Sequence, residues 1–157
     1  MVSHTKIKNG IAICAVIALL SVGACTESNY LIPVGNWTFQ GTNYTPTTTL
    51  DTGRTLTAST ATDSQQISFH FSNPPVAGGS YAIVSPSDTS VGNYVSIKMV
   101  LGGGAYHYAS TGKTPTPATV SMSFDKLSIS VKGSVEMVNT ANSSDSAAIT
   151  YLFVNQQ

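Results

Sequence analysis

The sequence predicts an all-β protein, folded as an antiparallel β-sandwich of about nine strands. Apolar and polar residues alternate at a period of two along most of the chain, which is the spacing of a strand with one buried face. No helical spacing of apolar residues continues over three turns, so no helix is predicted that could cover a parallel sheet. Turn-rich segments separate the alternating stretches. A closed up-and-down β-barrel is the alternative architecture.

The composition excludes two large classes of protein. The chain has 157 residues, which favours one domain, and its seven Lys and Arg residues balance seven Asp and Glu residues. Sequence-independent nucleic-acid binding needs clustered cations, and the sequence contains no such cluster. A disordered chain would have few apolar residues, whereas 41% of these residues are hydrophobic. We therefore expect a folded domain that does not bind nucleic acid.

The N-terminus has the three zones of a secretory signal. Lys6 and Lys8 precede an apolar block from Ile11 to Val22, and small residues follow it. A helix that spans a bilayer needs roughly 20 apolar residues, and this block is shorter. The pattern therefore predicts a segment that is read by the export machinery and then removed.

The small-residue zone, Leu20-Ser-Val-Gly-Ala-Cys25, resembles the lipobox of bacterial lipoproteins. In that family an aliphatic residue stands three places before an invariant cysteine, and Val22 fills that position here. The resemblance implies that residues 1–24 are a signal peptide cleaved after Ala24 and that Cys25 receives a diacylglyceryl thioether, followed by acylation with a fatty acid such as palmitate. The alternative is an ordinary secretory signal cut after Ala24, with Cys25 an incidental thiol.

The cysteine count agrees with lipidation. Cleavage removes Cys14 and leaves Cys25 alone, so no disulfide can form within the mature chain, and acylation makes an otherwise exposed thiol inert. Residues 25–35 are then a tether, and residues 36–157 form the β domain. Thr26 follows the acceptor where, by resemblance to enterobacterial sorting, an Asp would favour the inner membrane. We therefore expect a lipid anchor in the outer membrane of a bacterial cell envelope.

The predicted strands follow from alternation along the domain. Residues 127–137 keep one apolar parity, with Gly133 in phase, which predicts a long strand that bends or bulges at the glycine. Asp125-Lys126 is predicted to be the tight turn before it. The predicted strands, in order, are Trp37–Tyr44, Arg54–Ser59, Ile67–Phe71, Ser80–Val84, Tyr94–Leu101, Ala105–Tyr108, Val120–Phe124, Leu127–Met137 and Ala147–Val154.

The whole layout resembles the small single-domain lipoproteins common in Bacteroidetes, in which a lipobox and a short tether precede one β domain. The segments that carry the resemblance are Asn36-Trp-Thr-Phe39, Gly79-Ser-Tyr-Ala-Ile83, Lys126-Leu-Ser-Ile-Ser-Val-Lys-Gly133 and Ile149-Thr-Tyr-Leu-Phe153. These are strand patterns rather than chemical motifs. The resemblance therefore implies a fold and a location, and it brings no assigned activity.

No catalytic or metal-binding constellation is predicted. Serine hydrolysis needs a nucleophile, a base and an acid, but no Gly-x-Ser-x-Gly elbow singles out a serine. Zinc needs three or four ligands, and the mature chain offers only His70 and His107. His70 lies on the polar parity of its strand and is expected to face solvent or a neighbouring hydroxyl. Calcium needs clustered oxygen ligands, whereas single aspartates in separate turns are expected to bond their own backbone: Asp51, Asp63, Asp88, Asp125 and Asp145.

Three further motifs are interpreted as structural. Gly112-Lys-Thr114 imitates the end of a phosphate loop, but the required earlier glycine is absent and two prolines forbid the following helix. Gly102-Gly-Gly104 is predicted to be a hairpin loop with positive φ angles. Glu136 is the only glutamate in the domain, so no carboxylate pair for glycoside cleavage can be nominated. We therefore expect no cofactor and no metal.

Tyr106-His107-Tyr108 is the one candidate ligand-binding segment. Tyrosine combines a flat apolar ring with a polar tip, which suits binding to sugars or to protein surfaces. If Tyr106 and Tyr108 both face outward, they form a binding surface beside the glycine loop. If they face inward, they belong to the core, which is the usual place of alternating aromatic residues in a strand.

Asp145-Ser146-Ala147 resembles the acceptor for serine-linked glycans in secretory proteins of Bacteroidetes, so Ser146 is a candidate glycosylation site. Together these features predict a non-enzymatic, lipid-anchored envelope protein that scaffolds or binds another envelope component. The alternative is a surface lipoprotein that binds a carbohydrate or a small apolar ligand. A hydrolase is a remote third class.

Lipidation is tested by the change Cys25→Ser. The variant should be unprocessed or released from the membrane and should take up no labelled palmitate, because its hydroxyl cannot form the thioether. Equal labelling of the wild type and the variant would refute the assignment.

Overall fold

The structure is a computed structural model that describes residues 34–61, 64–90, 92–113, 117–123 and 126–156. The predicted signal peptide with Ala24, the predicted lipidation residue Cys25 and the tether up to residue 33 lie outside the described residues. The described residues belong to one compact unit of the chain, Leu31–Gln157.

The domain is all-β, as the sequence predicts, with one mixed sheet of twelve strands. The only helical turn in the described residues is a single 3₁₀ turn at Gly102–Gly104. In chain order the strands are β1 (Gly35–Phe39), β2 (Thr42–Tyr44), β3 (Thr48–Asp51), β4 (Thr55–Ser59), β5 (Gln66–Phe71), β6 (Ser80–Val84), β7 (Tyr94–Leu101), β8 (Tyr106–Ser110), β9 (Ala118–Ser123), β10 (Lys126–Val131), β11 (Val135–Asn139) and β12 (Ser146–Asn155).

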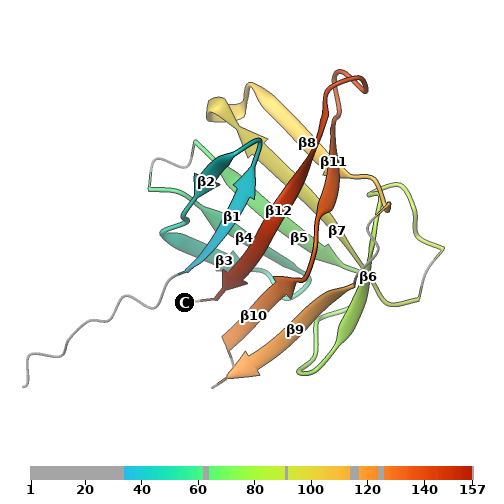
Figure 1. Ribbon diagram of the computed structural model, residues 1–157. Helices are drawn as coiled ribbons and strands as arrows, with labels where there is room; N and C mark the ends of the chain where they lie inside the picture. Colours follow the sequence, from blue (N-terminus) through green and yellow to red (C-terminus); the bar gives the residue numbers. More distant parts are fainter. Residues whose placement is uncertain (1–33, 62–63, 91, 114–116, 124–125, 157) are drawn as a thin grey trace, which may run out of the picture. The chain divides into compact units, whose positions relative to one another are not determined.

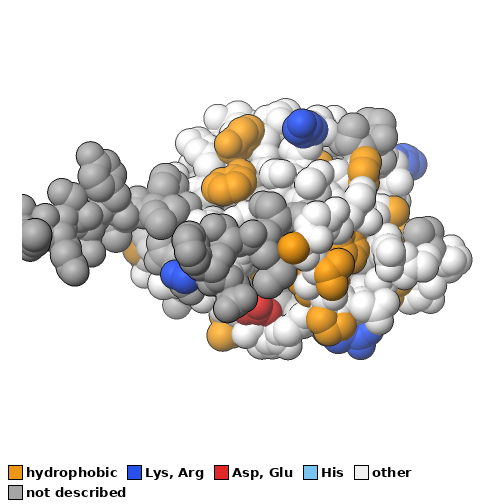
Figure 2. All heavy atoms as spheres, turned by 90° about the horizontal axis from the view of Figure 1, so that it is seen from below, with side chains coloured by type: hydrophobic (Ala, Val, Ile, Leu, Met, Phe, Trp, Pro, Cys, Tyr) orange, Lys and Arg blue, Asp and Glu red, His pale blue; other side chains and the backbone are white. Residues whose placement is uncertain are grey.

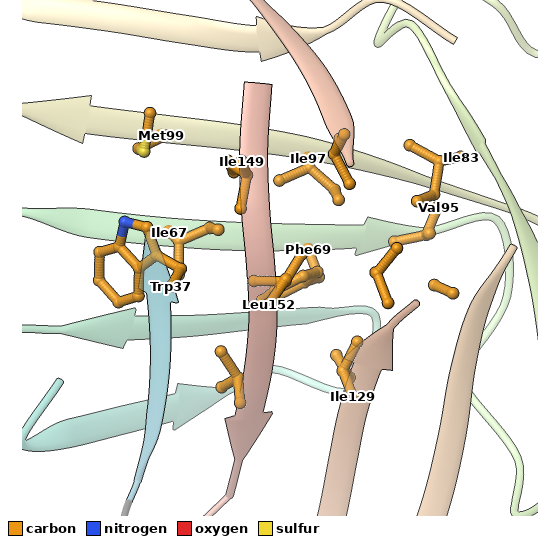
Figure 3. Packing of buried hydrophobic residues seen from close by; sticks show 14 of the residues in the cluster. Trp37, Ile67, Phe69, Ile83, Val95, Ile97, Met99, Ile129, Ile149 and Leu152 are labelled. Atoms are coloured by element: carbon orange, nitrogen blue, oxygen red, sulfur yellow. The ribbon is translucent and has the colours of Figure 1, made fainter. Parts of the chain in front are cut away.

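The sheet folds over into two layers that enclose the core. One layer contains β2, β1, β12, β10 and β9, and the other contains β3, β4, β5, β7 and β8 (Figure 1). Seen close by, the strands of one layer cross over those of the other, with apolar side chains between them (Figure 3). Fully buried side chains from both layers meet there, including Trp37, Leu152 and Ile129 on one side and Ile67, Phe69 and Ile97 on the other. The alternation in the sequence creates these two apolar faces.

Hydrogen-bonded strands also connect the two layers along their sides. At one end β12 pairs with β11, β11 with β8, and β8 with β7. At the other end β12 pairs with β10, β10 with β9, β9 with β6, and β6 with β7. The packing of two layers is that of a sandwich, and the closed ring of pairings gives the domain a barrel-like character.

The long strand predicted from residue 127 to residue 137 is divided at the expected glycine. β10 and β11 lie end to end on the same side of β12, and they are separated by residues 132–134. Gly133 has a φ of 104°, which a residue with a Cβ atom rarely adopts. Beyond the break, β10 pairs with β9 and β11 pairs with β8. The break is therefore one of the two places where the sheet divides into separate branches.

The second division occurs at β7. Residues 94–96 of β7 pair in parallel with β6, and residues 98–101 pair antiparallel with β8. Ile97 lies between these ladders, and its N–H donates to the Oγ of buried Ser110 at 3.0 Å. The Ser110 hydroxyl in turn donates to the Val84 carbonyl at 2.5 Å. One side chain thus satisfies a donor and an acceptor at the point where β7 changes its partner.

Several predicted boundaries were wrong. The predicted strand from Trp37 to Tyr44 is a hairpin of β1 and β2, because Gln40 and Gly41 both have positive φ angles, 49° and 76°, as a two-residue type I′ turn requires. Lys126 was predicted in a turn but pairs with Ser123 as the first residue of β10. The antiparallel prediction fails at β6 and β7, which run parallel.

The predicted number of about nine strands was too low. β3 was missed because its residues Thr48–Asp51 carry no buried apolar alternation, and Leu50 is 65% exposed. Within the described residues, no helix has both the length and the apolar character needed to cross a membrane.

The change Ser110→Ala should destabilise the fold. Leaving a buried hydrogen-bonding group unsatisfied costs about 1–3 kcal/mol, so losing the partner of both Ile97 and Val84 should lower the free energy of unfolding by about 2–6 kcal/mol. Ser87→Ala is the control, since Ser87 is exposed and bonds only to the Ser85 hydroxyl. Urea denaturation of both variants measures the difference. Similar stability of the two variants would contradict the assigned role of Ser110.

Candidate functional site

A hollow of about 480 Å³ lies where the β1–β2 turn, the β7–β8 turn and the start of β12 come together. Three tyrosines, one leucine, one glycine, one amide and one carboxylate line it. These residues are Gln40, Tyr44, Leu101, Gly102, Tyr106, Tyr108 and Asp145.

Two tight turns form part of its rim. Gln40 belongs to the type I′ turn between β1 and β2 and is the one described non-glycine residue with a positive φ. Gly102, Gly103 and Gly104 have φ angles of 61°, 66° and 98°, and they let β7 return as β8, with Leu101 paired to Tyr106. The predicted role of the three glycines in a hairpin loop is thus confirmed.

Tyr108 anchors the hollow to the core. It is 5% exposed, and its ring packs edge-on against Phe39 with 4.8 Å between ring centroids. Its hydroxyl donates to Asp145 Oδ2 at 2.8 Å, and Asn139 Nδ2 donates to the same oxygen at 2.8 Å. Among the described residues no donor bonds to Asp145 Oδ1. That oxygen is therefore able to accept a hydrogen bond from a ligand.

These contacts change two pKa values in opposite directions. Burial raises the pKa of the Tyr108 hydroxyl, and the hydrogen bond to Asp145 raises it further. The hydrogen bonds from Asn139 and then Tyr108 lower the pKa of the Asp145 carboxyl. At neutral pH the hollow therefore carries a carboxylate beside a neutral tyrosine.

Tyr44 and Tyr106 supply the accessible aromatic surface. Tyr106 is 54% exposed. Tyr44 is half-buried and stacks on Trp37, with 5.4 Å between ring centroids and 15° between ring planes. Trp37 is fully buried, and its Nε1 has no hydrogen-bond partner among the described residues. Figure 3 shows this nitrogen on the edge of the indole ring that faces Met99 on β7.

The predicted ligand-binding segment is divided between two hollows. Tyr106 and Tyr108 both line the hollow of about 480 Å³, with Tyr106 exposed and Tyr108 buried in the core. His107 has the opposite parity and lines a different hollow, of about 200 Å³, together with Tyr108, Lys98 and Thr140. His107 therefore does not join the two tyrosines in one site.

The other titratable residues form no catalytic cluster. His70 faces a neighbouring hydroxyl, as expected, with Nδ1 2.9 Å from Thr55 Oγ1. In the described part of the chain, no three His, Cys, Asp or Glu side chains lie together as metal ligands would. The carboxylates of Asp51 and Asp88 accept hydrogen bonds from backbone N–H groups two residues later, as predicted for turn formers.

Asp145 departs from that prediction because its carboxylate bonds to Tyr108 and Asn139 instead of a neighbouring backbone N–H. Asp63 and Asp125 lie outside the described residues. Ser146 is exposed at the first position of β12, opposite Val138, and glycosylation of it stays a prediction.

Most residues of the hollow could not be identified as site residues from the sequence. Gln40, Tyr44, Leu101 and Gly102 were assigned only to strands or turns, because period-two alternation identifies faces and not the ends of strands. The Gln-Gly pair was the available clue to the first turn, although Asn-Gly is the more usual pair there. No local pattern connects Asp145 with Tyr108, because their contact spans 37 residues.

One face of the domain carries few charged side chains. On the face shown in Figure 2, white atoms predominate, the charged side chains stand apart from one another and the hydrophobic side chains form small separate groups. This agrees with a chain of which 9% is charged.

Comparison of the chain with protein-family profiles, with curated proteins and with solved structures finds no match in any of the three. The geometry of the hollow and the sequence motifs are therefore the features from which a function can be inferred. Exposed aromatic faces bind flat apolar surfaces, and a carboxylate beside them accepts hydrogen bonds from hydroxyl groups. None of the described residues that line this hollow carries a cationic side chain. The arrangement suits a ligand that offers both a flat apolar face and hydroxyl groups.

The change Tyr108→Phe should weaken the response of stability to acid. The pKa of the Asp145 carboxyl is lowered from its ordinary value of 3.8, so the ionised carboxylate stabilises the fold at pH values above 3.8. This stabilisation is lost as the pH falls through the lowered pKa. Removing the Tyr108 hydroxyl, one of the two donors to Asp145, should reduce the loss of stability in acid. Part of that loss should remain, because Asn139 still donates to Asp145. Urea midpoints measured from neutral pH into the acid range test this, with Tyr151→Phe on exposed Tyr151 as the control. Identical pH profiles for both variants would contradict the prediction.

Proposed function

We propose that this protein is a lipid-anchored, non-enzymatic component of a bacterial cell envelope whose β domain binds carbohydrate in the hollow beside Tyr44 and Tyr106. The observation that carries the proposal is the combination of aromatic surface with the Asp145 carboxylate in one hollow of about 480 Å³. A volume of this order is typical of small-ligand sites, which occupy about 300–1,000 Å³.

Carbohydrate fits the chemistry of the lining. A pyranose ring has an apolar face of C–H groups that can lie on an aromatic ring, and its hydroxyl groups can donate to a carboxylate. Tyr106 offers an exposed ring, and Asp145 Oδ1 accepts no hydrogen bond from the described residues. The Gln40 side chain adds an amide at the rim that can both donate and accept. A purely apolar ligand would leave these polar groups unsatisfied.

The lipobox-like segment supports the anchored location. An acyl chain contributes about 0.8 kcal/mol per buried methylene, so the combined chains of a lipidated Cys25 would hold the domain at the membrane on a cellular timescale. Thr26 after the acceptor favours the outer membrane in this proposal. A binding domain held at that surface would capture a glycan close to the cell.

The change Tyr106→Ala tests the proposed binding site. In a glycan array with the full-length protein, the variant should bind more weakly than the wild type. Its affinity for a glycan bound by the wild type should fall about 2- to 13-fold, because an aromatic contact contributes about 0.5–1.5 kcal/mol. The sequence contains one tryptophan, Trp37, which stacks on Tyr44, so its fluorescence provides a second measure of binding.

Tyr151→Ala is the matched control. Tyr151 is also 54% exposed, but it lies on β12 outside the residues that line the hollow. This variant should bind as the wild type does. Absence of glycan binding by the wild type, or equal binding by Tyr106→Ala and Tyr151→Ala, would contradict the proposed function.

A further inference from the structure

A third hollow, of about 360 Å³, lies against β4, β5 and β7. Of the six described residues that line it, five are polar, and two of these carry nitrogen donors. The lining residues are Thr55, Ser68, His70, Pro86, Ser96 and Lys98.

The strand register brings these polar side chains together. His70 on β5 pairs with Thr55 on β4 and with Ser96 on β7, and Ser68 pairs with Lys98 one step along the same face. The residues between them, including Phe69 and Ile97, are fully buried. Because side chains alternate along a strand, the polar set lies on the face of the sheet that is turned away from the core.

Ser96 distinguishes this hollow from an ordinary polar surface. The residue is 3% exposed, and its hydroxyl bonds to none of the described residues. Its Oγ is not one of the fully buried polar atoms without a partner, so the hydroxyl is reached from the hollow that the residue lines. A hydroxyl in that position can bond to a ligand bound there.

Lys98 and His70 supply the nitrogen donors of this hollow, and neither is paired with a carboxylate among the described residues. Lys98 is exposed and forms no ion pair with the described residues. His70 uses Nδ1 in its contact with Thr55, and when Nδ1 accepts from the Thr55 hydroxyl, Nε2 carries an N–H that can donate. No carboxylate among the described residues lines the hollow.

We propose that this hollow binds a phosphate group. A phosphate has several acceptor oxygens and negative charge, and Lys98, His70 Nε2 and the Ser96 hydroxyl offer donors from two adjacent strands. The phosphate belongs either to a soluble sugar phosphate or to a lipid headgroup, since both present the same group. None of the described residues that line this site lines the first hollow, which contains Tyr44, Tyr106 and Tyr108 and is called the tyrosine hollow below. The phosphate site can therefore be tested independently of the proposed function.

Calorimetric titration of the full-length protein in detergent with inorganic phosphate tests the site. Lys98→Gln and Ser96→Ala should each weaken phosphate binding about tenfold, because each removes a donor to a charged ligand. Lys126→Gln is the matched control: it removes an exposed lysine of β10, outside the hollow, and should bind phosphate as the wild type does. Circular dichroism confirms that each variant is folded.

Two further ligands identify the source of the phosphate. Glucose 6-phosphate and a short-chain, monomerically soluble phosphatidylglycerol are titrated into the wild type and into Lys98→Gln. Tighter Lys98-dependent binding of the sugar phosphate supports the site with a soluble ligand, and tighter binding of the phospholipid supports it with a lipid ligand. Absence of phosphate binding by the wild type, or equal affinity in Lys98→Gln and Lys126→Gln, would overturn the proposal.

Discussion

β7 has two different neighbours along one of its sides, and the fold depends on how the change between them is made. A sheet that divides leaves backbone groups without a ladder partner, and such groups are costly when they are buried. The Ser110 hydroxyl accepts from Ile97 and donates to Val84, so both groups are satisfied at the division. Because the divergence of β6 and β8 makes the closed ring of strands, this one hydroxyl supports the architecture of the whole domain.

The same architecture positions the tyrosine hollow. The pairing of β8 with β11 places Tyr108 near the start of β12, where its hydroxyl donates a hydrogen bond to Asp145. The β1–β2 turn reaches the hollow from the other edge of β12. Tyr108 thus links the core to the rim, while Tyr106, two residues earlier on the same strand, is left accessible. The accessible surface is held by strands and not by a long loop.

Alternation in the sequence predicts the fold class and most strands, because apolar burial on one face of each strand is a local property. Pairing partners are not local, so neither the parallel pair of β6 and β7 nor the bond from Ser110 to Val84 could be predicted. β3 lacked an apolar face, and Gln40 adopts a positive φ although it is not a glycine. The Tyr106 segment was identified from its aromatic residues, but the other sides of the hollow come from distant segments that only the folded chain brings together.

The pairings of β12 also govern the order in which the domain can assemble. β12 is the last strand of the sheet along the chain, and it pairs with β1, the first, as well as with β10 and β11. A nascent chain that still lacks this strand cannot join the β1–β2 hairpin to β10 and β11. The domain therefore completes its folding only after synthesis has passed residue 155, and its folding rate is governed by contacts between the most distant parts of the sequence.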